Sequence, residues 1–285
     1  MLLSVDTKNA FAVATHVGEI LRRSHPGHQP TLIERVAPRV IDMFMGNHPD
    51  FHPVDLAYHD LEHTMQASLC MAQILDGNCR SPDGWPLTAR QFELGVVAAL
   101  LHDVGYLKSR SDTEGTGAKY TYCHVLRSAA FAASYLPSVG VEEGEISGVL
   151  GAINCTGQAK QIGRLHFRDD TERFIGCALA TADYLGQMAA PDYPDELEIL
   201  YLEFCESDDY AHVPQDRRIF RSAADLQART PEFWRKLVLP KLTNDFQAVY
   251  RFLTQPGGAN PYLDAVARNI AIIEARAAAS TSALV

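Results

Sequence analysis

Residues 98–105, Ala-Ala-Leu-Leu-His-Asp-Val-Gly, place a histidine and an aspartate directly after a strongly apolar run. Ionisable groups beside a buried segment are costly in free energy unless they are paired or bind a metal. The pair His102-Asp103 therefore points to a functional site. The alternative is that the two residues cap a helix as it enters solvent, with Gly105 as its stop signal.

Apolar residues recur at helical spacing along most of the chain, and no alternating run of β-branched residues between turn signals predicts a strand. The expected fold is all-α, a helical bundle with N- and C-terminal helical extensions, in a single domain over residues 1–285. The expected helices span residues 8–23, 30–46, 60–76, 88–103, 122–136, 142–155, 170–188, 194–206, 231–254 and 260–279.

The bulk composition is that of an ordinary globular protein, with 47% hydrophobic and 21% charged residues. Twenty-five basic and 35 acidic residues give a net charge of −10, which argues against a nucleic-acid polymer or an anionic membrane as partner. The six cysteines stand singly, as reduced core thiols do. No leader and no apolar run of membrane-spanning length is visible, so the expected compartment is the cytoplasm.

Residues 191–216 contain acidic side chains and no Lys or Arg. Such runs usually form a solvated face, which is the interpretation favoured here, and the alternative is a surface that binds a partner.

Two further segments carry ionisable side chains. Residues 58–63, Tyr-His-Asp-Leu-Glu-His, place two histidines four residues apart, so that on a helix they would share one face. Asp183 is a lone acid inside another apolar helix, where a carboxylate is energetically unusual; capping or a surface position is the competing explanation. With His102-Asp103, these residues form a mixed nitrogen and oxygen ligand set suited to Zn, Mn, Fe, Co or Mg.

The ordered set His63, His102-Asp103 and Asp183 resembles the HD-domain metal-dependent phosphohydrolase superfamily. The Tyr-His-x-x-x-His opening resembles its class I cyclic nucleotide phosphodiesterases in particular. The similarity covers an HD core of approximately residues 55–190 and leaves residues 191–285 as a C-terminal helical extension.

The resemblance implies that His63, His102, Asp103 and Asp183 hold one divalent metal ion tightly, chosen among Mg, Mn, Zn, Fe and Co. It also implies that Asp103 bridges to a second, looser ion and that His59 protonates the leaving oxygen as a general acid. The implied activity is hydrolysis of a phosphoester of a nucleotide or another small phosphorylated metabolite by a metal-activated water.

The sequence departs from the phosphodiesterase pattern at two places. Asp60 stands where those enzymes have Asn, and His102-Asp103 is followed by Val-Gly-Tyr-Leu-Lys without a further Asp-His pair. The departures argue against a cyclic nucleotide as the substrate.

Three more residues are predicted to contact substrate or metal. His124 opens a helix of small residues in the interval where dinuclear HD proteins supply an extra ligand, or it is simply a helix-terminal histidine. Lys108 and Arg127 flank the motifs and are candidates for holding phosphate oxygens, or they are ordinary surface bases. Gln187, one helical turn after Asp183, either faces the same pocket or has a packing or solvent-facing role, and the second interpretation is favoured.

Two other function classes are compatible with the sequence. The HD scaffold also resembles that of di-iron oxygenases, which need more histidines than the motifs supply. A non-catalytic sensor that keeps the fold and the metal is the second alternative. The intact ligand set and His59 favour the hydrolase.

Overall fold

The computed structural model describes residues 5–157 and 162–282, and every regular element within these ranges is helical. One isolated β-bridge joins Phe51 to Ser109. The all-α prediction is therefore confirmed. The α-helices of the described ranges are α1 (Ala10–Ser24), α2 (Thr31–Phe44), α3 (Leu61–Arg80), α4 (Ala89–Leu101), α5 (His124–Tyr135), α6 (Glu143–Asn154), α7 (Asp170–Met188), α8 (Tyr193–Tyr210), α9 (Ala223–Phe233) and α10 (Pro261–Ser282).

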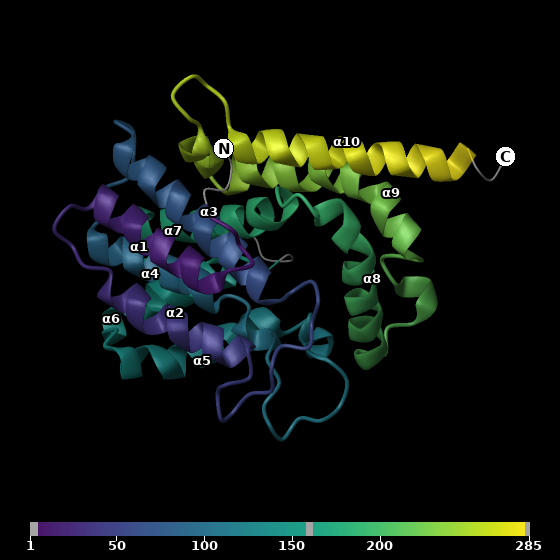
Figure 1. Cartoon of the computed structure of the whole chain (residues 1–285), viewed down its shortest axis with the longest axis horizontal. Helices are drawn as coiled ribbons and strands as arrows, with labels where there is room; N and C mark the ends of the chain where they lie inside the picture. The colour runs from purple at the N-terminus through teal and green to yellow at the C-terminus, as the bar shows by residue number, and fades with distance from the viewer. Residues whose placement is uncertain (1–4, 158–161, 283–285) are drawn as a thin grey trace.

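Helices α1 to α7 form the main body, α8 descends along one side of it, and α10 crosses the top and extends past it (Figure 1). Helix α3 lies at the centre of the body, in contact with α1, α4 and α7. Most residues of α3 and of α7 are buried, polar ones included. The two helices approach closely at Gly186, where a Cβ would lie 3.0 Å from the backbone nitrogen of Ala67.

Helix α3 begins at Leu61, one residue after the expected start at residue 60. The Asp60 carboxylate accepts a hydrogen bond from the His63 N–H at 2.9 Å and so forms the N-cap. His59 therefore precedes the helix, and the expected helical pairing of His59 with His63 is wrong. Asp60 stands where the phosphodiesterases have Asn. Because Asp and Asn cap helices about equally well, the substitution keeps the capping role.

The single helix expected over residues 231–254 is also wrong. Helix α9 ends at Phe233, and the chain continues through two π-helical segments, Trp234–Val238 and Lys241–Asp245, before a 3₁₀ turn at Val249–Leu253. Pro240 lies between the π segments; because proline lacks an N–H and its ring crowds the carbonyl four residues back, a regular α-helical ladder cannot continue there. Ala248 then adopts a left-handed conformation, with φ of 51°, which ends the helical segment.

The acidic segment 191–216 contains the whole of α8, and part of it faces the protein. Glu203 is only 6% exposed, Glu206 accepts hydrogen bonds from Thr116, and Asp208 accepts one from Tyr122. The interpretation as a purely solvated face is thus wrong for these side chains.

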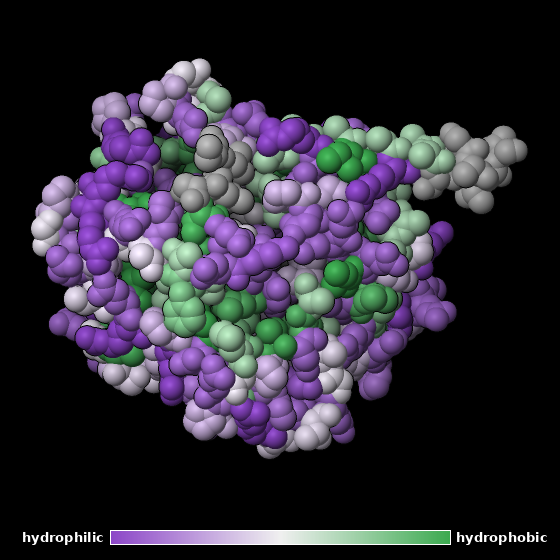
Figure 2. All heavy atoms as spheres, in the orientation of Figure 1, coloured by the Kyte–Doolittle hydropathy of each residue, from purple (hydrophilic) through white to green (hydrophobic). Residues whose placement is uncertain are grey.

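The visible surface is largely hydrophilic, with apolar residues gathered in a band across the middle of the face in Figure 2. Within residues 5–157 and 162–282, no helix combines the length and the apolarity that crossing a bilayer requires.

Candidate metal centre

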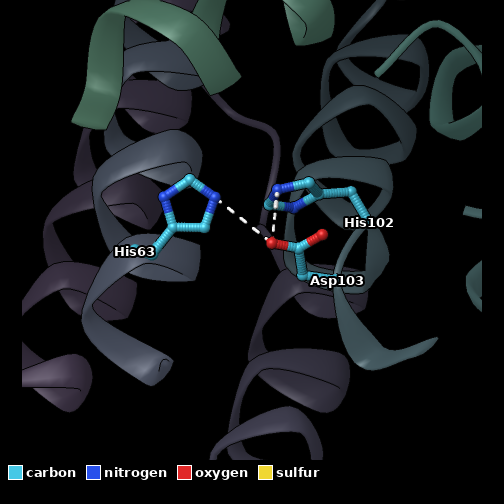
Figure 3. A group of neighbouring side chains, drawn as sticks. All are labelled: His63, His102 and Asp103. Carbon is cyan, nitrogen blue, oxygen red and sulfur yellow. Dashed lines mark ion pairs between the residues drawn. The ribbon is translucent and has the colours of Figure 1, made fainter. Parts of the chain in front are cut away.

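Four of the side chains singled out in the sequence meet in one buried cluster. His63 comes from α3, His102 is the C-cap of α4, Asp103 follows it at the start of a 3₁₀ turn, and Asp183 lies in α7. Ligand atoms of His63, His102 and Asp103 lie within 4.8 Å of one another, and Figure 3 shows both rings turned toward the Asp103 carboxylate.

The distances bring Asp183 into the same group. His63 Nε2 lies 3.2 Å from Asp103 Oδ2 and 3.3 Å from Asp183 Oδ1. His102 Nε2 lies 3.3 Å and 3.6 Å from the same two oxygen atoms. Two imidazole nitrogens and two carboxylate oxygens thus point toward a common centre.

The ring of His102 is held in the orientation of a metal ligand. Its Nδ1 donates to the Ala99 carbonyl at 2.7 Å, which leaves Nε2 without a proton when the ring is neutral. Nε2 is buried and has no hydrogen-bond partner in the part of the chain that the structure describes. A buried nitrogen lone pair without a donor is costly unless a cation occupies the position.

The charges of the cluster fit a divalent cation. Burial favours a neutral His63, but the hydrogen bonds that its Nε2–H donates to Asp103 and Asp183 outweigh burial and raise the pKa of His63 to about 10. Burial would raise the pKa of Asp183, yet His102 and His63 lower it to about 2. Once His63 gives up its proton, the two carboxylates and the two neutral imidazoles carry two negative charges, which a divalent ion balances.

His59 lies beside this cluster and is held by a residue that sequence reasoning missed. Its Nδ1 is 2.6 Å from Oε2 of Glu203, in α8, and the second oxygen of Glu203 accepts from the Tyr58 N–H at 2.8 Å. The His59 ring meets the His63 ring edge to face at a centroid separation of 5.7 Å. Glu203 therefore orients His59 with Nε2 as its remaining nitrogen.

Tyr106 packs between His59 and His124. Its ring stacks on His59 at 4.6 Å and on His124 at 4.3 Å. His124 opens α5 as expected; its Nδ1 lies 2.7 Å from the Thr121 carbonyl, and its Nε2 is 3.7 Å from Asp103 Oδ1. Burial lowers the pKa of His124, which favours the neutral, ligand-competent ring.

Gly105 allows two backbone segments to pack closely, which differs from the role of a helix stop signal that the sequence suggested. A Cβ on Gly105 would lie 2.0 Å from the His124 carbonyl oxygen, and the Gly105 N–H donates to Ser128 at 2.9 Å. The absence of a side chain lets the segment carrying Asp103 approach the start of α5.

The two predicted phosphate-binding bases are engaged in structural contacts. Lys108 is 8% exposed; its ammonium lies 2.9 Å from Asp55 and donates to the Gly115 carbonyl. The guanidinium of Arg127 donates to the carbonyls of Gly105 and Leu107, and it lies over the Tyr120 ring at 3.5 Å. These contacts hold the loop before α5.

Comparison with protein-family profiles matches residues 42–275 to the family described as Npun_R2479-like. Neither curated proteins nor solved structures gave a match. The matched region spans well over half of the 285 residues and contains His59, Glu203 and all four residues of the cluster. The chain therefore belongs to the Npun_R2479-like family.

Proposed function

We propose that the protein is a metal-dependent phosphohydrolase of the HD type that cleaves a phosphoester of a nucleotide or another small phosphorylated metabolite in the cytoplasm. The convergence of His63, His102, Asp103 and Asp183 carries this proposal. Residues separated by 120 positions bring complementary ligand atoms to one buried point, with the nitrogen of His102 left without a partner among the described residues. This arrangement costs free energy without a cation.

The site also offers the groups that phosphoester hydrolysis needs. A divalent cation held by the four ligands would neutralise phosphate charge and make a nearby water more acidic. With its Nδ1–H held by Glu203, His59 in its doubly protonated form would donate the Nε2 proton to the leaving oxygen as the phosphorus–oxygen bond breaks. The oxygen of water would bond to phosphorus, and the proton that the water loses would return to His59 Nε2. Burial of His63, His102 and Tyr106 limits the access of bulk water to the cluster beside His59.

A second, weaker cation position is part of the proposal. Asp103 has one oxygen facing the two histidines and the other facing His124 Nε2, 3.7 Å away. These two side chains offer only two protein ligands, so an ion there would complete its coordination with water or substrate oxygen. We therefore assign His124 to this weaker position.

A metal-resolved activity screen tests the function. The chelator-stripped protein is reloaded separately with Mg, Mn, Zn, Fe or Co, and product release is measured on phosphomonoesters and phosphodiesters. We expect hydrolysis with at least one ion, none in the stripped protein, and none in the His102→Ala variant. A wild-type protein that retains metal but hydrolyses none of the substrates would instead be the sensor, and oxygen consumption with iron would indicate the oxygenase.

Metal affinity is expected to rise with pH. His63 carries a proton below its raised pKa of about 10, and this proton must leave before Nε2 can bind a cation. One proton released per ion makes the affinity for Zn²⁺ increase about tenfold per pH unit between about pH 6 and about pH 8. Competition against a chelator of known proton linkage measures this slope, and an affinity independent of pH would exclude His63 as a ligand.

Glu203→Gln is expected to lower turnover about ten- to a hundredfold while the metal stays bound. The amide keeps the size of Glu203 and an acceptor for the Tyr58 N–H, but it cannot hold His59 with a carboxylate. Because the effect acts through the proton donor, the loss should be greatest for substrates with a poor leaving group.

Glu206→Gln is the matched control for this variant. Glu206 lies one helical turn further along α8 and bonds to Thr116, not to His59. The Glu206→Gln variant should retain the turnover of the wild-type protein. Equal losses in both variants, or loss of metal from Glu203→Gln, would refute the orienting role of Glu203.

A further inference from the structure

Tyr58 and Gln187 form a hydrogen-bonded chain that ends on a residue of the metal cluster. The Tyr58 hydroxyl donates to Gln187 Oε1. The Gln187 amide nitrogen, on α7, donates to the Asp183 carbonyl at 3.0 Å and contacts Asp183 Oδ1 at 3.4 Å. Asp183 Oδ1 is the same oxygen that faces the two histidines.

The direction of this chain follows from the donor and acceptor chemistry. A phenol is a hydrogen-bond donor at neutral pH, and Tyr58 is only 4% exposed, so its O–H needs an acceptor inside the protein. Gln187 supplies that acceptor only with its carbonyl oxygen turned toward Tyr58, which turns its NH₂ group toward Asp183. The reversed amide would place an oxygen against both Asp183 acceptors.

Tyr58 also connects this chain to the proposed proton donor. Its N–H donates to Glu203, whose other oxygen pairs with His59. Its ring lies nearly parallel to that of His63, at 25° and 6.3 Å between centroids. Tyr58 thus contacts the partner of His59 through its backbone N–H and the partner of Asp183 through its hydroxyl.

We propose that Tyr58 and Gln187 are positioning residues that hold the Asp183 carboxylate in its metal-binding orientation. This inference rests on the proposed function, because it needs Asp183 to bind a cation. Groups that orient metal ligands in this way typically contribute about ten- to a hundredfold to metal affinity. Neither residue has to touch the cation for this effect.

The test is the affinity of the folded protein for Zn²⁺ and Mn²⁺ in Tyr58→Phe, Gln187→Met and the double variant. Each single change should weaken binding about ten- to a hundredfold. The double variant should bind no more weakly than Gln187→Met alone, because Tyr58 acts through Gln187. Tyr262→Phe is the control, since Tyr262 is equally buried but lies in α10 beside Cys70.

Unfolding of the metal-free proteins separates positioning from a structural role. A structural role would lower the unfolding midpoint of the metal-free variants and leave the affinity of the folded protein unchanged, which would overturn the inference. Wild-type affinity in Tyr58→Phe and Gln187→Met would overturn it as well. If the wild-type protein binds none of Mg, Mn, Zn, Fe and Co, the proposed function fails, and this inference fails with it.

Discussion

His102→Ala and Asp103→Ala are expected to abolish metal retention. Each removes one of the four proposed ligands, and the three that remain leave the coordination of the ion incomplete. Elemental analysis after gel filtration should find metal in the wild-type protein and none in either variant. An ion present at a thousandfold excess over its dissociation constant stabilises the wild type by about 4 kcal/mol, and this stabilisation should disappear in the variants.

Two kinds of control make this result specific. Asp103→Asn keeps the size of the side chain and removes its charge, so that metal loss in a normally folded protein cannot be ascribed to a cavity. His52→Ala removes a histidine that contacts the Arg110 carbonyl instead of the cluster, and it should keep its metal. Wild-type metal content in either His102→Ala or Asp103→Ala would rule out the assigned ligands.

His59→Ala is expected to keep the metal and to lose about 10²–10⁴ in turnover, the usual scale for general acid catalysis. His59 contacts the His63 ring from outside the group of ligand atoms and is paired with Glu203. The loss should be much smaller for a nitrophenyl phosphoester, because nitrophenolate departs with little need of a proton. An alkyl or ribose oxygen needs that proton as the bond breaks.

The comparison of the two substrate types is the control for the role of His59. Equal losses on both would indicate that His59 positions the substrate or supports the fold. Release of the metal from His59→Ala would make His59 a ligand. Only a loss that depends on the leaving group, with the metal retained, agrees with proton donation.

Much of the local structure could be predicted from the sequence because its causes are local. The apolar run before His102 predicted the end of a helix, and α4 ends at Leu101. The helical spacing around Asp183 predicted α7 closely, since a 3.6-residue period needs no knowledge of the partner helix. The long helix expected across Pro240 failed for the opposite reason: the pattern of apolar residues continues there, but the backbone lacks a donor.

The supporting residues of the site could not be predicted. Glu203 is 144 residues from His59 along the chain and sits in a run of acids, where nothing distinguishes it from its solvated neighbours. A packing role was the favoured interpretation of Gln187, and only the tertiary structure shows that its side chain accepts a hydrogen bond from the Tyr58 hydroxyl. Lys108 and Arg127 had the right charge and the right neighbourhood in sequence, but backbone carbonyls and Asp55 engage them.

The sequence by itself determined the helices and the types of side chain available for a metal, because periodicity and side-chain chemistry are properties of short segments. The motif order implied, through the resemblance, that the four ligand candidates lie together, and the tertiary structure decided the geometry of their meeting and the residues that support them. The close packing of α3 against α7 places His63 next to Asp183, and the return of α8 along the body brings Glu203 to His59. Such contacts depend on the relative placement of whole helices, which is set by the sum of many packing interactions and leaves no signal in any one segment.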